Sequence, residues 1–118
     1  MSEGSVQWRM RMRSSAWRPP TDLFETEESI VVRVEIAGMD EDDFNIELTD
    51  HILSIHGYRQ DVQEERAYHQ AEIRFGEFNI EIHLPVPVET RAVEAKYKNG
   101  FLRVTLPKAQ SAQIRVED

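Results

Sequence analysis

The sequence predicts an all-β domain built as an antiparallel sandwich of two sheets. Apolar and polar residues alternate over several short segments, and this is the period of a half-buried strand. Proline and glycine punctuate those segments, and we find no convincing apolar stripe of an amphipathic helix. About seven to nine short strands in 118 residues are typical of such a sandwich, in the manner of immunoglobulin-like domains.

Asn99-Gly100 marks the best-defined element, a hairpin over residues 93–106. Asn-Gly favours a two-residue type I′ turn, because both central residues of that turn need positive φ. The turn sets a register that pairs Lys98 with Phe101, Tyr97 with Leu102, Ala95 with Val104, and Val93 with Leu106. One face of the hairpin then becomes almost wholly apolar, as a sheet that covers a core requires.

The remaining strands follow from the same alternation. We expect a short edge strand over residues 21–25 and a clear strand over 30–37 that Gly38 ends. Residues 44–48 and 52–57 form the next two, and residues 40–43 before them make an acidic turn without a calcium-loop pattern. In residues 73–84 the apolar positions change from odd to even at Gly76, which indicates a bulge or a break there.

Residues 58–72 are charged and carry no clean period. A helix is the competing interpretation, because Gln, Glu, Arg and Ala all favour one. The apolar positions do not sustain a helical stripe, so we interpret the segment as a long loop with room for a short strand. A loop of this length inside a compact domain is usually functional or contacts a partner.

Three parts organise the chain: an arm over residues 1–16, the sandwich over 17–108 and a tail over 109–118. Basic and apolar residues alternate in the first part, which suggests an arm that touches client proteins, membrane or neighbouring subunits. The apolar residues expected to make these contacts are Trp8, Met10 and Met12, together with Trp17 directly after the arm. The alternative is a frayed terminus. In the tail, Ile114 and Val116 would point the same way in an extended chain. They fit either addition to another chain's sheet edge or a strand that folds back on its own domain.

Composition excludes several classes of function. Residues 1–20 contain four arginines and one glutamate, which gives a charge of about +3. Because the net charge of the chain is −8, the remaining residues carry about −11. An acidic body disfavours nucleic acid as a partner. Cysteine is absent, and neither a signal peptide nor a membrane-spanning run is evident, which is compatible with a cytoplasmic protein. We find no catalytic motif, cofactor fingerprint or metal-ligand spacing among the four histidines, so we expect no enzyme, no cofactor and no metal.

Several stretches, in order along the chain, resemble the alpha-crystallin domain of the small heat-shock proteins. The hairpin matches the signature Ala-x-x-x-Asn-Gly-x-Leu at residues 95–102. The other matches are Glu35-Ile36-Ala37-Gly38, Ile52–Gly57, Phe75-Gly76-Glu77-Phe78 with Leu84-Pro85, Leu106-Pro107-Lys108, and Ile114-x-Val116. Together they span about residues 19–116, and their joint occurrence is more specific than any single string.

The resemblance implies an ATP-independent holdase chaperone, which binds unfolded clients and assembles with itself through dimers into larger oligomers. In this family the long loop exchanges a strand between subunits, here near Ala67, Tyr68 and His69. The tail motif docks in an apolar groove of a neighbouring dimer, near Phe44, Ile46, Val93 and Ala95. The alternative is a p23-like co-chaperone or adaptor that binds one folded partner. The sequence disfavours a membrane surface as the main partner.

Two positions depart from the family pattern. Ile80 stands where an arginine is common, so the resemblance does not imply the family's ion pair near the dimer interface for this chain. The arm of about 16 residues is shorter than usual, and a short arm would weaken client capture and high-order assembly.

Overall fold

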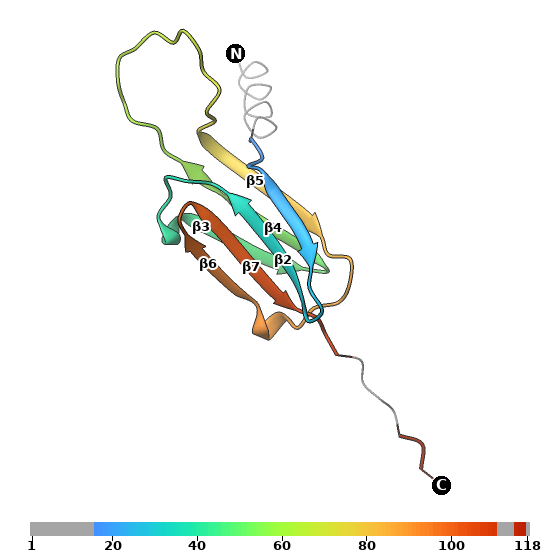
Figure 1. The fold of residues 1–118 in the computed structure, drawn as a ribbon. Helices are drawn as coiled ribbons and strands as arrows, with labels where there is room; N and C mark the ends of the chain where they lie inside the picture. Colours follow the sequence, from blue (N-terminus) through green and yellow to red (C-terminus); the bar gives the residue numbers. More distant parts are fainter. Residues whose placement is uncertain (1–15, 111–114, 118) are drawn as a thin grey trace, which may run out of the picture.

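The computed structural model describes residues 16–110 and 115–117, and these residues form two antiparallel sheets stacked face to face (Figure 1). The first sheet has the order β1-β2-β7-β6, with β1 at Thr21–Glu25, β2 at Ser29–Glu35, β7 at Phe101–Pro107 and β6 at Glu94–Lys98. The second has the order β3-β4-β5, with β3 at Phe44–Thr49, β4 at Ile52–Arg59 and β5 at Gly76–His83. The predicted all-β sandwich is confirmed.

Helical structure in the described part of the chain is confined to two 3₁₀ turns, η1 at Glu41–Asp43 and η2 at Thr90–Ala92. The predicted acidic turn is η1. The amide of Asp43 donates to the carbonyl of Asp40 (3.0 Å), and the amide of Asp40 donates to the carboxylate of Asp43 (3.1 Å). These local bonds satisfy backbone groups and direct the chain from β2 into β3.

The core fills the space between the sheets because the strands turn alternate side chains toward it, although β2 also buries Val31 on its other face. In β5, for example, Phe78, Ile80 and Ile82 are buried while the residues between them are exposed. Fully buried aliphatic side chains come from both sheets and from the residue after β2, and they are Ile30, Val31, Val32, Val34, Ile36, Leu53, Ile55, Ile80, Val104 and Leu106. The strongly periodic sequence segments therefore supply the layer that holds the two sheets together.

The predicted hairpin has the expected turn and register. Asn99 (φ 53°) and Gly100 (φ 82°) both adopt positive φ. Lys98 pairs with Phe101, and the pairing continues in register as far as Glu94 with Thr105. The predicted pair of Val93 with Leu106 does not form. Val93 directly follows η2, and β6 begins only at the next residue, Glu94.

The expected break at Gly76 is the start of a strand rather than a bulge within one. Ile73 and Phe75 lie outside β5, and their exposed fractions are 74% and 39%. Residues 60–75 form one long loop without strand pairing, which projects from the sandwich beside the segment that enters it (Figure 1). The odd-numbered apolar residues before Gly76 therefore do not extend the buried face of β5, because they belong to the loop.

Trp17, expected in the arm, lies in the core, and this corrects the sequence-based prediction. Only 8% of the side chain is exposed. Its amide donates to the carbonyl of Glu77 (3.1 Å), its carbonyl accepts from the amide of Asn79 (3.0 Å), and its ring meets Phe78 edge-on at 6.1 Å. The segment thus covers the outer edge of β5, where unpaired backbone groups would otherwise remain.

The root of the tail is fixed to the sandwich. The amide of Lys108 donates to the carbonyl of Glu28 (2.9 Å), and that of Ala109 donates to the carbonyl of Pro87 (3.0 Å). The ammonium of Lys108 lies 2.6 Å from the carboxylate of Glu25. The chain therefore leaves the domain from a defined point, at the end opposite the long loop (Figure 1).

Gly57→Ala tests the closest packing in the core. A Cβ at this position would lie 2.7 Å from the carbonyl oxygen of Asp43 and 2.8 Å from Cζ of Phe78. Because the backbone oxygen cannot move freely, we expect a loss of about 1–3 kcal/mol in the free energy of unfolding, measured by urea denaturation. Gln60→Ala, at an exposed position nearby, is the control. Equal stability of the Gly57 variant and the wild type would contradict the described packing.

Candidate functional site

An apolar groove of about 370 Å³ runs between the edge strands β3 and β6. The two strands belong to different sheets and are not hydrogen-bonded to each other, so the sandwich is open along this side. The lining residues are Glu41, Phe44, Ile46, Ala95, Lys96, Tyr97, Lys98 and Leu102. Its floor is apolar and its rim carries charges of both signs.

Aromatic contacts shape one wall of the groove. The rings of Phe44 and Tyr97 lie 5.1 Å apart between centroids, and Phe44 also meets the buried Phe78 at 6.2 Å. The hydroxyl of Tyr97 donates to the carbonyl of Ile36 (2.8 Å) and accepts from the amide of Met39 (3.3 Å). The wall is therefore anchored both to the core and to the backbone that follows β2.

The structure brings together three of the four residues predicted for the groove. Phe44 and Ile46 lie on one side and Ala95 on the other. Val93 does not line it; this side chain packs against the main core. Sequence reasoning missed Tyr97, although it lies two residues from Ala95 on the same face of β6, and that spacing could have identified it.

Ala67, Tyr68 and His69 all lie in the exposed part of the long loop. A small polar cluster organises this part: Arg66 pairs with the carboxylate of Asp61, and its Nε donates to the hydroxyl of Tyr68 (2.8 Å). The bond to that hydroxyl, helped by Asp61 and opposed by partial burial, raises the pKa of Arg66 above its ordinary value. These contacts lie within the loop itself, and 61% of Tyr68 remains exposed.

Strand β1 leaves an edge of the first sheet unpaired in this chain. It pairs with β2 on one side alone among the described residues. Leu23 on β1 has an exposed fraction of 45%. Phe24 is packed beneath the guanidinium groups of Arg33 and Arg103, which lie 5.4 and 5.7 Å from its ring centroid. A partly apolar strand edge is a template for pairing with another chain.

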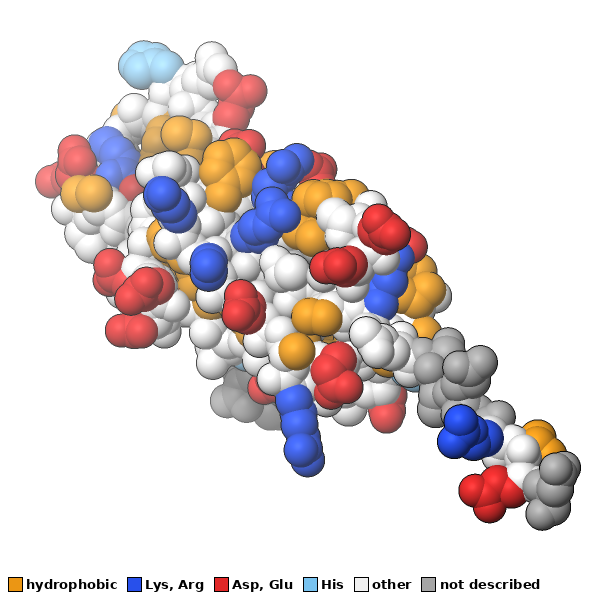
Figure 2. All heavy atoms as spheres, turned by 60° about the horizontal axis from the view of Figure 1, so that its bottom comes forward, with side chains coloured by type: hydrophobic (Ala, Val, Ile, Leu, Met, Phe, Trp, Pro, Cys, Tyr) orange, Lys and Arg blue, Asp and Glu red, His pale blue; other side chains and the backbone are white. Residues whose placement is uncertain are grey.

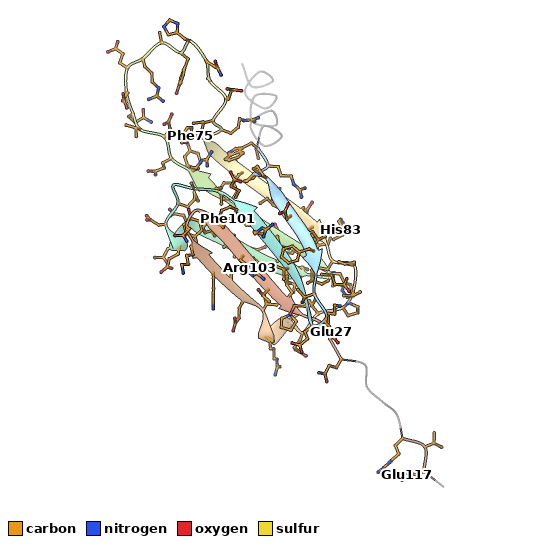
Figure 3. The ribbon with its side chains drawn as sticks, viewed as in Figure 1. Glu27, Phe75, His83, Phe101, Arg103 and Glu117 are labelled. Carbon is orange, nitrogen blue, oxygen red and sulfur yellow. The ribbon has the colours of Figure 1, made fainter. Side chains whose placement is uncertain are left out.

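The remaining predicted residues lie at the two ends of the chain. Val116 has an exposed fraction of 90%, and Glu117 beside it lies away from the sandwich (Figure 3). Ile114 lies outside the described residues, as do Trp8, Met10 and Met12 of the arm. The structure thus shows half of the tail motif, on a segment without contact to the domain in Figure 1.

On the face shown in Figure 2, charged side chains of both signs are interspersed, with apolar patches between them. Within residues 16–110 and 115–117, no cluster of three or more histidine or acidic side chains is placed to hold a metal ion. The same residues contain no helix long and apolar enough to cross a membrane.

Comparison with known proteins gives a consistent result. The model of the Hsp20/alpha crystallin family matches residues 22–117. The chain is 34% identical to the probable 15 kDa heat shock protein of Leptospira interrogans, over 98% of this chain and 86% of that protein. It is also 34% identical to the small heat shock protein C2 of Rickettsia felis, over 82% of this chain but only 64% of that longer protein.

Solved structures agree with the sequence relatives. HspA from Xanthomonas axonopodis superimposes with a TM-score of 0.76 and 27% identity, over 83% of this chain and all of that one. A small heat-shock protein from Xylella fastidiosa, described as having a distinct high-order structure, gives a TM-score of 0.76 and 25% identity over 88% of this chain and 98% of that chain.

Tyr97→Phe tests the anchoring of the groove wall. The substitution removes the hydroxyl and leaves the carbonyl of Ile36 without that donor, so we expect a loss of about 1–2 kcal/mol in the free energy of unfolding. Urea denaturation measures it. Tyr58→Phe is the matched control, because 60% of that tyrosine is exposed. A loss of the same size in both variants would contradict the anchoring role.

Proposed function

Because this chain belongs to the Hsp20/alpha crystallin family, we propose that it is an ATP-independent holdase that binds partly unfolded proteins and prevents their aggregation. The observation that carries the proposal is the apolar groove between the unpaired edges of β3 and β6. A monomer with an open apolar groove is exposed to aggregation unless something covers it. Reversible assembly covers it, and release of the same surface presents it to clients.

The tail is the occupant that we propose for the groove in the assembled state. Ile114 and Val116 are two residues apart, so an extended tail places both side chains on one face. The apolar floor formed by Phe44, Ile46 and Ala95 suits two such side chains, and backbone bonds to an open strand edge would add affinity. The exposure of Val116 supports docking on a neighbouring subunit.

Dimer formation is proposed to use the long loop. Among the residues that the structure describes, 67–69 have no strand partner and β1 pairs on one side alone. A loop strand from one subunit that pairs with β1 of the other would satisfy the unpaired backbone groups of both. Leu23 and Tyr68, exposed here, would be covered in the same step.

Client capture needs no chemical step, and we assign no catalytic residue. The apolar residues of the arm, Trp8, Met10 and Met12, are proposed as a second client contact. The absence of cysteine fits a reducing compartment, and we place the protein in the cytoplasm.

Ala95→Glu tests tail docking from the side of the groove. Ala95 is exposed in the sandwich, so the domain should fold, while a carboxylate in the groove opposes burial of an apolar tail. We expect the mass in solution, measured by light scattering over a dilution series, to fall from that of a multimer of dimers to that of a dimer. The double variant Ile114→Ala/Val116→Ala should give the same change.

The control for that experiment is Ala92→Glu, which adds the same charge at an exposed residue of η2 outside the groove. The mass of this variant should equal that of the wild type. If the wild type, the groove variant and the tail variant are all dimers, the tail does not link subunits. A monomeric wild type would contradict strand exchange as well.

Holdase activity is tested by light scattering from heated client proteins without ATP. We expect the chain to delay the aggregation of at least two unrelated enzymes, because exposed apolar surface binds unfolded chains without regard to sequence. Ala95→Glu should change the ratio of chain to client that gives half protection, since it alters the groove that clients share with the tail. Protection of a single folded partner and no general client would contradict the proposal.

A further inference from the structure

Arg59, the last residue of β4, contacts three separate parts of the chain through its guanidinium group. Its Nε donates to the carbonyl of Arg74 (3.1 Å), and Nη2 donates to the same oxygen. On the other side, Nη1 donates to the carbonyl of Ala37 (3.3 Å), which follows β2. The planar group thus joins the end of the long loop to the opposite sheet.

Two aromatic rings enclose the same guanidinium group. Its carbon lies 4.6 Å from the ring centroid of Trp17 and 5.0 Å from that of Phe75. Phe75 lies at the base of the long loop (Figure 3). Because Trp17 is bonded to β5 through its backbone, the stack ties the entering segment, the loop and both sheets to one side chain.

These contacts lie where the strand ladder stops. Arg59 and Gly76 are the last pair between β4 and β5, and residues 60–75 leave the ladder from this pair. Beyond it, the described chain has no further strand pairing to hold the two ends of the loop. The orientation of the loop therefore depends on side-chain contacts at its base, and the most numerous are those of Arg59.

We propose that Arg59 is a positioning residue that fixes the base of the loop, so that residues 67–69 are directed toward the edge of a partner's β1. The effect of Arg59 on dimer formation rests on the proposed strand exchange. Its effect on the base of the loop is independent of that exchange. Fixing the base in advance reduces the conformational entropy lost on pairing and therefore strengthens the dimer. Lysine cannot replace this role, because a single ammonium group cannot donate to both carbonyls and contact both rings at the same time.

The hydrogen-bond partners of Arg59 predict how its contacts respond to salt. The polar partners found for Arg59 are carbonyl oxygens, and none of the three ion pairs in the described residues includes it. Its hold on the loop should consequently change little between low and moderate salt, whereas an ion pair would weaken.

The first experiment measures Trp17 directly. In a Trp8→Phe background Trp17 is the only tryptophan, and its fluorescence reports access by acrylamide. We expect Arg59→Gln to raise the quenching constant at least twofold and Arg59→Lys to raise it by less. Arg91→Gln, an exposed residue of η2 at the other end of the sandwich, should leave it unchanged. An unchanged constant in Arg59→Gln would overturn the proposal.

The second experiment measures the dimer, with hydrogen exchange of the loop amides alongside. We expect the dissociation constant of the Arg59→Gln dimer to rise about tenfold, with the unfolding midpoint of the sandwich shifted by only a few degrees. A dissociation constant equal to that of the wild type, with a lower unfolding midpoint, would show a purely structural residue and overturn the positioning role. If the wild type itself is monomeric, strand exchange fails. Faster exchange of loop amides in Arg59→Gln then still supports a fixed loop base, and unchanged exchange overturns it.

Discussion

A row of four aromatic rings crosses the molecule, and the rest of the structure depends on it. Trp17 meets Phe78, Phe78 meets Phe44, and Phe44 meets Tyr97. The row begins where the chain enters the sandwich, passes through the core and ends in the wall of the groove. Phe78 at its centre is fully buried and leaves no room for a side chain at residue 57. Both features proposed for assembly, the loop base and the groove, are therefore built on the same core contacts.

Local sequence patterns were sufficient for most of the fold. The Asn99-Gly100 turn determined the hairpin register because these residues strongly favour a two-residue type I′ turn, and the register decides which side chains face the core. The strands with strict alternation were equally predictable. The start of β5 was not, because a change of parity at Gly76 is produced by a bulge and by a strand end alike.

Features that depend on contacts between distant segments could not be derived from spacing. Trp17 follows an arm with a similar alternation of basic and apolar residues, and nothing local shows that its ring packs on Phe78, sixty-one residues later. The groove was predicted from a family resemblance, and Phe44, Ile46 and Ala95 line one groove in the structure. The resemblance misplaced Val93, because η2 occupies the residues where an ideal hairpin would continue. The contacts of Arg59 gave no sequence signal at all.

One edge strand of the sandwich is covered by the chain itself, and the other edge strands are open. The entering segment covers β5, whereas β1, β3 and β6 each have an edge without a strand partner in the part of the chain that the structure describes. A protein that worked alone would be expected to protect such edges with charges, prolines or bulges. Here the charged rim of the groove protects only in part, since Phe44, Ile46 and Ala95 remain accessible between the charges. The distribution suits a subunit whose edges are completed by neighbours.

The fixed root of the tail also sets a length scale. Lys108 and Ala109 are bonded to the sandwich, and seven residues separate Ala109 from the far end of the Ile114-x-Val116 motif. A fully extended chain spans at most about 3.6 Å per residue, so the motif reaches no farther than about 25 Å from its root. With so short a tether, only grooves within that radius are accessible, and their effective concentration is high. In the proposed docking, the length of the tail would therefore limit the distance between neighbouring dimers. The same limit would apply to the curvature and closure of the whole assembly.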